Sequence, residues 1–449
     1  MYSLFILVCL VPLWMVWRNM NRALYRDAFS PFNLLFYFWI APFVLSLAEL
    51  SSLQKGFSGG ALLVVFTSTL ILIATCLVPA FAVNRSRSKP RNVAKSVELH
   101  PGGIIVFFLV TLVALYYAEF SDRDLPLIAY LIGDVTDSNL HTAGKDSKLQ
   151  VIAFGIYAAA ILLFHLWLVE KNRWRRASYL CVCLLIVSLG LLKTSKSDIY
   201  IPILSFAGLT YYHYRDNKLK VPRRFKVLAF IVACLVISIT AVRLEGIGLV
   251  GGYASLIEFK YSEEIGAFAS QAVSIVYGYT ALGFQNFSNF FDSNIVEFRI
   301  GTSLFRPVLS MLMMGQTADA MGVSVERWNV VSDAANTGTF LTPLYIEGGA
   351  LFCFLGAAVY GTLVNTVYVA SRSPRSLKWR LVYVSLLFPW TWLFFTNAFS
   401  VLSIYVNVFY VLALSALSTR HLPRKRSSIV VPEVPDRSLT LRADHGGKP

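Results

Sequence analysis

The chain has 449 residues, of which 56% are hydrophobic and only 14% are charged. Its 40 Lys and Arg outnumber 25 Asp and Glu, which gives a formal net charge of +15. In a soluble protein this charge would suggest a nucleic-acid partner, but the high fraction of hydrophobic residues excludes the class of soluble nucleic-acid-binding proteins. We therefore expect no nucleic acid, and assign the basic residues to the headgroups of a lipid bilayer.

Long apolar runs follow one another along the chain, each near the ~20 residues that a helix needs to cross ~30 Å of hydrocarbon. They predict an all-α polytopic membrane protein with about 11 transmembrane helices, one membrane domain over 1–449. A short apolar start can also be a signal peptide, but no charged segment precedes the first run and no small-residue cleavage site closes it. We keep it as a span. In chain order the runs are Tyr2–Trp17, Pro31–Leu47, Ala61–Val83, Ile104–Phe120, Val151–Val169, Tyr179–Leu192, Ile199–Tyr212, Val227–Val242, Gly349–Ala370, Leu381–Phe399 and Val401–Leu417.

Basic residues lie mostly in every second gap between these runs. Because Lys and Arg are enriched in cytoplasmic loops, this alternation predicts the N-terminus outside and the C-terminus in the cytoplasm. Residues 420–449 then form a cytoplasmic, disordered tail, and residues 243–336 form one large external segment. The basic gaps are residues 18–26, 85–95, 171–176, 215–226, 372–380 and the tail from Arg420.

The external segment is too apolar and aromatic, with too few Gly and Pro, to be a linker. Within it, Glu263–Phe291 has helical length and apolar residues recurring at three and four. Such a stretch can lie flat in the membrane interface as an amphipathic helix or enter the membrane as a re-entrant helix. Leu304–Met314 is a second apolar piece of this kind.

No metal ion or other cofactor is expected. All six cysteines lie inside apolar runs, where small buried hydrophobic side chains are the better interpretation. The six histidines are scattered without ligand spacing.

A sparse set of charges on the external side supplies the candidate site. Guanidinium groups bind phosphate through two hydrogen bonds, and ammonium groups act as point charges for it. The alternative for each basic residue is that its side chain only extends to the lipid headgroups, or pairs with a neighbouring Asp or Glu. Arg243, Arg306 and Lys196 are the stronger candidates because their positions break the charge rule. The set comprises Lys193, Lys196, Arg243, Glu245, Arg299, Arg306 and Arg327.

A polar motif, Asn336-Thr-Gly-Thr-Phe-Leu-Thr-Pro-Leu-Tyr-Ile-Glu-Gly-Gly349, leads directly into a predicted span. Asn336, Thr337 and Glu347 can bind sugar hydroxyls, while the glycine pair permits close backbone approach. Ordinary helix packing explains the glycines equally well. Nearby aromatic residues could stack on sugars or form an interfacial belt; they are Tyr277, Tyr279, Phe284, Phe287, Phe290, Phe291 and Trp328.

In these features the chain resembles Wzy-type oligosaccharide repeat-unit polymerases of O-antigen, capsule and exopolysaccharide assembly. The resemblance covers nearly the whole length: many spans, a large external loop in the C-terminal half, the Lys193–Asp198 hairpin and the motif from Asn336 to Gly349. It implies a GT-C-like membrane fold in the bacterial inner membrane. It also implies a metal-independent, inverting glycosyltransferase that joins undecaprenyl-diphosphate-linked repeat units at the periplasmic face.

The resemblance also implies roles for the candidate residues. Arg243 and Arg306 would hold the diphosphate of the donor, with Lys196 assisting, and Glu245 and Glu347 compete as the base that activates the acceptor. The hairpin carries lysines where part of the family carries arginine. The implied partners are the lipid-linked donor and acceptor and a chain-length regulator. The remaining substrate-binding candidates are Lys193, Arg299, Arg327, Asn336, Thr337 and Tyr345.

Two alternatives stay open. An O-antigen ligase would use the same lipid-linked donor with a lipid A core acceptor, but relies on an external histidine, and only His141 is available. A lipid-linked oligosaccharide flippase or other transporter would be expected to carry charge deep within its spans and short loops on both sides.

The predicted orientation is testable at Asn294, within the long external segment. A reporter enzyme that is active only outside the cytoplasm should be active when fused there, whereas a cytoplasmic reporter should not. The reverse pattern would overturn the assigned sidedness.

Overall fold

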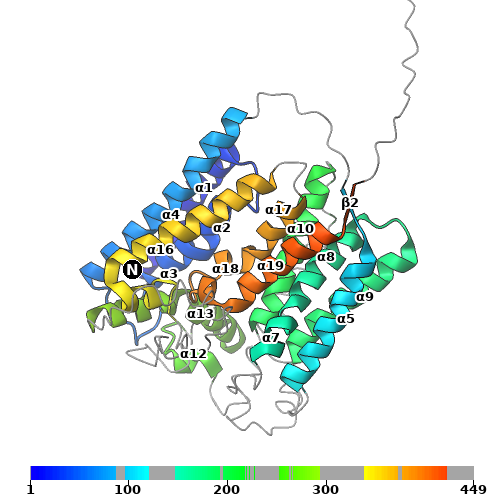
Figure 1. Cartoon of the computed structure of the whole chain (residues 1–449). Helices are drawn as coiled ribbons and strands as arrows, with labels where there is room; N and C mark the ends of the chain where they lie inside the picture. The colour runs from blue at the N-terminus through cyan, green and yellow to red at the C-terminus, as the bar shows by residue number, and fades with distance from the viewer. Residues whose placement is uncertain are drawn as a thin grey trace, which may run out of the picture.

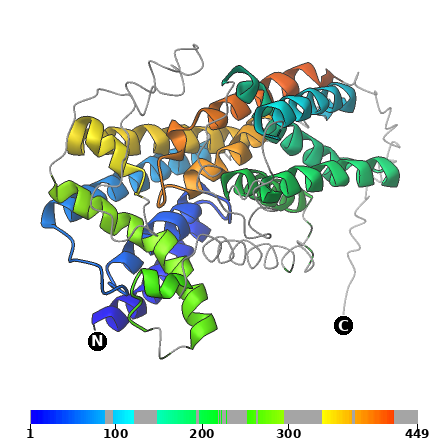
Figure 2. The same cartoon turned by 90° about the horizontal axis from the view of Figure 1, so that it is seen from below.

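The computed structural model describes residues 2–86, 97–120, 147–192, 196–217, 252–261, 266–293, 338–372 and 377–421, with isolated residues 219, 222, 227 and 264. These residues are mostly helical. Figures 1 and 2 show the helices gathered into one bundle.

The N-terminal elements form two helical passages and a long third helix. A turn separates the first passage from the second, where Ser30 caps the next helix by accepting from the Asn33 amide and Pro31 starts it. That second passage contains a π-helical turn, Phe36–Ile40, which carries the fully buried Trp39. The elements are α1 Tyr2–Leu24, α2 Pro31–Leu35, η1 Phe36–Ile40, α3 Ala41–Ser46 and α4 Gly59–Ser86.

The middle of the chain packs around α8, which is apolar on all sides. Ala158–Leu163 of this helix are buried, as expected for a helix with no polar face. It packs against α5, α9, α10 and α19. The elements are β1 Val97–Leu99, α5 Pro101–Leu115, η2 Tyr116–Phe120, α7 Ser147–Ala153, α8 Gly155–Val169, α9 Arg173–Leu192, α10 Lys196–Asp216, α12 Gly252–Leu256 and α13 Ala267–Asp292.

The C-terminal helices pack against both the N-terminal helices and the helices around α8. Helix α16 packs along α4 and also against α17, which in turn contacts α10 and α19. The two short strands pair antiparallel, Val97 opposite His421, and join the start of α5 to the end of α19. The elements are α16 Leu341–Ser371, α17 Leu377–Ser385, α18 Leu387–Thr391, η5 Ala398–Ser400, α19 Leu402–Leu417 and β2 Thr419–His421.

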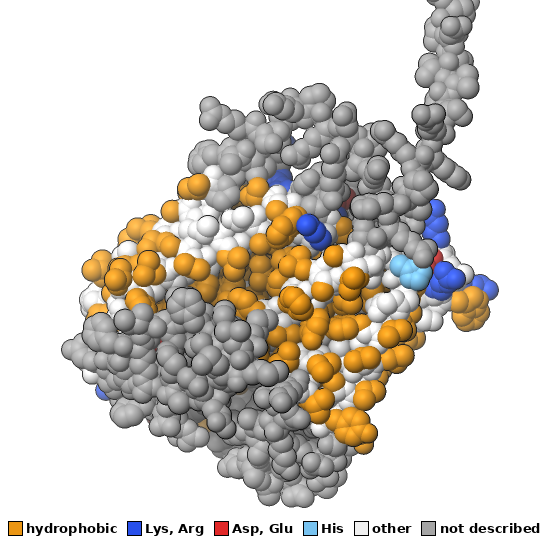
Figure 3. Space-filling view, viewed as in Figure 1, with side chains coloured by type: hydrophobic (Ala, Val, Ile, Leu, Met, Phe, Trp, Pro, Cys, Tyr) orange, Lys and Arg blue, Asp and Glu red, His pale blue; other side chains and the backbone are white. Residues whose placement is uncertain are grey.

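The surface of the bundle is that of a membrane protein. Helix α5 exposes Val106, Val110 and Val113 at more than half of their area, at the four- and three-residue spacing of one helix face. Figure 3 shows hydrophobic side chains across the middle of the visible described surface, with Lys and Arg mainly toward its upper and right edges. Contiguous exposed apolar area of this kind suits lipid rather than water.

Four helices in the described part of the chain are long and apolar enough to cross a membrane: Gly59–Val78, Pro101–Ala118, Leu149–Val169 and Leu341–Ser371. Pro31–Ser46 and Leu402–Leu417 are apolar but shorter. The predicted run Val227–Val242 lies almost wholly outside the described residues. The all-α membrane class is thus supported, while the number of spans stays a prediction.

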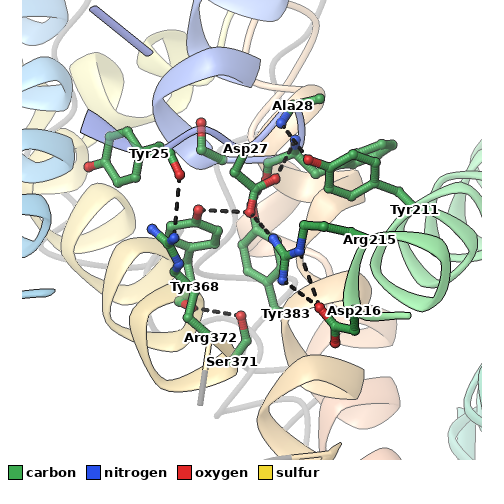
Figure 4. A network of polar contacts seen from close by, with 12 residues as sticks. Tyr25, Asp27, Ala28, Tyr211, Arg215, Asp216, Tyr368, Ser371, Arg372 and Tyr383 are labelled. Carbon is green, nitrogen blue, oxygen red and sulfur yellow. Dashed lines mark hydrogen bonds and ion pairs between the residues drawn. The ribbon is translucent and has the colours of Figure 1, made fainter. Parts of the chain in front are cut away.

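One end of the bundle is held by a buried ion pair (Figure 4). The Asp27 side chain is 0% exposed, and its Oδ2 lies 2.6 Å from Nη1 of Arg215 at the end of α10. The same oxygen accepts from the Tyr368 hydroxyl of α16 at 2.9 Å, and Oδ1 accepts from the Phe29 amide. We call this end, where α1, α10 and α16 finish, the arginine end.

The network around Asp27 is extended by two further pairs. Asp216 accepts from Arg215 at 3.2 Å and lies 2.7 Å from Arg380 of α17. Burial is the largest single influence and acts to lower the pKa of Arg215. The carboxylates of Asp27 and Asp216 and the hydroxyls of Tyr211 and Tyr212 together outweigh it, so that this pKa lies above its ordinary value. The guanidinium is therefore always charged, and three helices are fastened to the turn that follows α1.

Removing the charge of Asp27 should destabilise the protein. In Asp27→Asn the partly buried Arg215 guanidinium loses its nearer counter-ion and keeps only Asp216, which we expect to cost about 1–3 kcal/mol. Chemical unfolding in a mild detergent measures this change. Glu170→Gln is the matched control: it lies partly exposed at the end of α8, its side-chain oxygen can still accept from the Lys171 and Asn172 amides, and it should change stability by less than about 1 kcal/mol. Equal stability of the two variants would contradict the assigned role.

Candidate functional site

Helix α13 crosses the bundle at the end opposite to the arginine end. The prediction of a helix over Glu263–Phe291 is confirmed, with bounds Ala267–Asp292. Its Tyr277 hydroxyl accepts from the Leu50 amide at 3.0 Å, and Ser288 accepts from the Ser58 amide at 3.1 Å. These contacts place α13 across the end of α3 and the start of α4.

Helix α16 is broken at its glycine pair. Gly348 has φ −166° and ψ 24°, and Gly349 has φ 65° and ψ −156°, a conformation that is open essentially only to glycine. The segment before the break folds back along the segment after it. The Cys353 thiol lies 3.5 Å from the Leu341 carbonyl, and a Cβ on Gly356 would meet Leu344 at 2.3 Å. Residues Leu341–Glu347 are thus a short re-entrant helix, and Ala350–Ser371 is the candidate span.

The start of this re-entrant helix lies deep in the bundle. The Phe340 ring is 5.0 Å from that of Trp39. The indole of Trp39 donates to Thr69, which lies midway along the candidate span Gly59–Val78. Phe340 is therefore level with the middle of a span.

A second break lies beside the start of the re-entrant helix. The predicted span Leu381–Phe399 is helical only to Thr391, and turns follow from Trp392. The physical reason is a contact with the residue that precedes the re-entrant helix: the Phe340 amide donates to the Leu393 carbonyl at 2.9 Å. Non-helical backbone at membrane depth persists only where protein covers it or where it lines a water-filled cavity.

Helix α13 packs onto the second break and onto the segment just before the re-entrant helix. A Cβ on Gly283 would lie 2.9 Å from the Phe394 carbonyl oxygen and 3.5 Å from the Gly338 backbone, so only glycine permits this approach. We call Gly283–Asn289, Gly338–Gly349 and Trp392–Val401 together the helix-break site.

The helix-break site is polar although it is buried. Glu347 is 0% exposed, and six further polar side chains are buried with it. Buried polar groups in a membrane protein are costly and mark functional positions. The six are Gln285, Asn286, Ser288, Thr339, Thr342 and Asn397.

Two of the predicted site residues belong to this site. Glu347 ends the re-entrant helix directly before the glycine pair. Tyr345 is buried two residues earlier, and its ring contacts Phe287, Phe290 and Phe291 at 4.9–6.3 Å. The other predicted residues lie outside the described residues: Lys193, Arg243, Glu245, Arg299, Arg306, Arg327, Asn336 and Thr337. Lys196 begins α10, and its side chain is not described.

Several aromatic side chains that could have stacked on sugars pack within the protein instead. Phe284 contacts Trp39 at 4.7 Å and Phe43 at 5.4 Å between ring centroids. Tyr277 and Phe287 are also buried. Trp328 lies outside the described residues.

Sequence reasoning did not find Tyr360 and Asn397. Asn397 falls within the predicted span Leu381–Phe399 but lies, buried, in the turn after α18, where its Nδ2 donates to the Tyr360 hydroxyl at 3.2 Å. Tyr360 lies inside an apolar run and gave no signal. For Asn397, the polar pair Thr396-Asn397 within an aromatic stretch was the available signal.

The arrangement offers a carboxylate among amides and hydroxyls. Amides and hydroxyls both donate and accept hydrogen bonds, as a hydroxyl-rich ligand requires. A buried carboxylate can accept a proton from such a ligand. No family model, curated protein or solved structure matches the chain.

The break at Gly349 is open to a direct test. Gly349→Ala forces a Cβ into a conformation that costs about 1–3 kcal/mol, so the unfolding midpoint in detergent should fall. Gly59→Ala is the control, because nothing lies within 4 Å of a Cβ there. If both variants unfold alike, the break has been assigned wrongly.

Proposed function

We propose that this protein is an inverting membrane glycosyltransferase that polymerises undecaprenyl-diphosphate-linked oligosaccharide repeat units for a bacterial surface polysaccharide. The observation that carries the proposal is the buried carboxylate of Glu347 at the break in α16, in a site that also holds buried amides and hydroxyls. The sparse external cations of the sequence complement it.

The chemistry needs one acid–base group and concentrated positive charge. A hydroxyl oxygen of the acceptor attacks the anomeric carbon of the donor, the bond from that carbon to the diphosphate oxygen breaks, and the hydroxyl proton passes to Glu347. The anomeric configuration inverts because attack and departure occur on opposite faces. Arg243 and Arg306, with Lys196, neutralise the departing diphosphate, which is the type of electrostatic stabilisation that contributes most in such reactions.

The proposal includes the finer topology. It has about 11 spans, a GT-C-like fold, an external N-terminus and a cytoplasmic C-terminus in the inner membrane. In this orientation the arginine end faces the cytoplasm, and the helix-break site faces the periplasm. Its support is the distribution of charge: Arg215 and Arg372 lie at one end of the bundle, and Glu347 lies toward the other end.

A transporter of lipid-linked oligosaccharide is the second candidate. The observation that favours it is the break after Thr391, where the Leu393 carbonyl pairs with Phe340 level with the middle of a span, since broken helices often form transporter substrate sites. The two functions differ in what accumulates: a transporter's loss strands repeat units in the cytoplasmic leaflet, whereas a polymerase's loss leaves single repeats outside.

The test replaces Glu347 and the arginines in cells that make the polysaccharide. Glu347→Gln should reduce long polysaccharide by about 10²-fold or more and leave single repeats, since general-base catalysis contributes about 10²–10⁴-fold. Arg243→Ala and Arg306→Ala should each have a similar effect, since losing one group that stabilises developing charge costs about 10²–10³-fold. Glu170→Gln should keep the full ladder of chain lengths.

The contradicting outcomes are distinct. Normal chain lengths in all three variants, at normal protein levels, would remove the proposed function. Repeat units held in the cytoplasmic leaflet would favour the transporter. Polymer of full length that is not attached to lipid A core would favour the O-antigen ligase.

A further inference from the structure

Four aromatic side chains from three segments meet beside the second break. The ring of Trp392, the first residue of the turn after α18, lies 4.7 Å from that of Tyr200 near the start of α10 and 5.3 Å from that of Phe395, between centroids. The Phe395 ring in turn lies 5.7 Å from that of Tyr279 on α13. All four side chains are partly exposed. We call Tyr200, Tyr279, Trp392 and Phe395 the aromatic patch.

Two members of the aromatic patch have a polar group that makes no hydrogen bond to the protein. The buried indoles of Trp17, Trp39 and Trp390 each donate their N–H to an acceptor at 2.8–3.0 Å. Within the described residues, neither the Trp392 indole nor the Tyr200 hydroxyl has such a partner. An unpaired N–H or O–H group is costly against hydrocarbon. The aromatic patch therefore faces water or a polar ligand, and not lipid tails.

The composition of the aromatic patch also differs from that of the lipid-facing surface. On α5 that surface consists of aliphatic side chains such as Val106 and Val110, which are more than half exposed. The aromatic patch instead combines rings from three segments, and its Trp and Tyr rings end in an N–H or O–H group. Such rings pack on the apolar C–H face of a sugar, and their polar ends can hydrogen-bond its hydroxyls. A hydroxyl-rich ring is thus the ligand that fits this chemistry.

The aromatic patch is continuous with the helix-break site. Between Trp392 and Phe395, the Leu393 carbonyl accepts from the Phe340 amide, and the Phe394 carbonyl lies against Gly283 of α13. A ligand on the patch would therefore lie next to the buried polar groups of that site.

The position of Tyr200 places the aromatic patch toward the proposed periplasmic end. Helix α10 ends at the arginine end, where Arg215 pairs with Asp27, so its start points toward the opposite end of the bundle. Tyr200 also lies about one helical turn after Lys196, a predicted phosphate ligand. The patch is thus near two parts of the candidate site that are far apart in the sequence.

We propose that the aromatic patch binds a sugar ring of the lipid-linked oligosaccharide. The ligand class is a pyranose whose C–H face packs on Trp392 and Tyr200 and whose hydroxyls bond to their N–H and O–H groups. The inference rests on the proposed function and adds to it a position for the sugar, separate from the cations that hold the diphosphate.

The test measures binding alone. The probe is the oligosaccharide repeat that mild acid releases from its lipid in extracts of cells that lack the gene, so neither diphosphate nor lipid contributes. Calorimetric titration of the full-length protein in detergent gives the Kd. We expect Trp392→Leu to raise it about 3- to 10-fold, and Tyr200→Phe, which keeps the ring and removes only the hydroxyl, to raise it about 3-fold. Trp174→Leu removes an exposed indole at the start of α9 and should leave the Kd unchanged.

A second measurement reports what Trp392 faces. In liposomes, the fluorescence that is lost in Trp392→Phe relative to the wild type comes from this indole. It should be quenched by acrylamide in the water and not by phospholipid brominated in its acyl chains. Quenching by the brominated lipid would overturn the inference, because the patch would then be part of the lipid-facing surface.

The remaining outcomes separate this inference from the proposed function. If the wild type makes polymer in liposomes but binds no released oligosaccharide, or binds it with the same Kd as Trp392→Leu and Tyr200→Phe, the sugar position alone is overturned. A higher Kd in Trp392→Leu that comes with a lower unfolding midpoint, while Tyr200→Phe binds normally, would also overturn it by showing a packing role. If the wild type makes no polymer, the proposed function is removed even where the sugar binds.

Discussion

The ion pair between Asp27 and Arg215 is the interaction on which the arrangement of this bundle depends. A carboxylate without exposed surface is tolerated only with a counter-ion and further hydrogen bonds, and Asp27 has both. Its partners come from α10 and α16, nearly 190 and more than 340 residues away in the chain. Satisfying one buried charge thus fixes the relative positions of helices that the sequence keeps far apart.

Because the arginine end is fixed, the helix backbone at the opposite end of the bundle can be irregular. Helices α4 and α16 run side by side from the arginine end to α13, so their packing carries the position of one end to the other. The breaks at Gly348–Gly349 and Trp392 expose backbone groups that need partners. At the second break the Leu393 carbonyl accepts from the Phe340 amide, and α13 covers the Phe394 carbonyl and the Gly338 backbone. The irregular backbone is therefore stable because it is paired and buried.

Much of the fold could be predicted from hydrophobic runs and charge, because both act locally. The runs around Ala61–Val83 and Val151–Val169 are long helices, and the amphipathic period of Glu263–Phe291 gave α13. The break after Thr391 could not be predicted, because its cause is a backbone hydrogen bond to Phe340, a residue from another segment. The role of Asp27 could not be predicted for the same reason: its partners come from other segments, and within its own basic segment it is one acid among arginines.

The same distinction, between local sequence signals and contacts that only the fold creates, explains which residues of the candidate site could be predicted. Glu347 was found because a carboxylate at the entrance of an apolar run is locally anomalous, and the adjacent glycines indicated an unusual backbone. Tyr360 and Asn397 are each ordinary in their local sequence, and their hydrogen bond forms because the fold brings α16 beside the turn after Thr391. A carboxylate or a glycine pair carries unusual chemistry, which the sequence displays. An aromatic or amide side chain takes its role from its neighbours, and those neighbours are supplied by the fold.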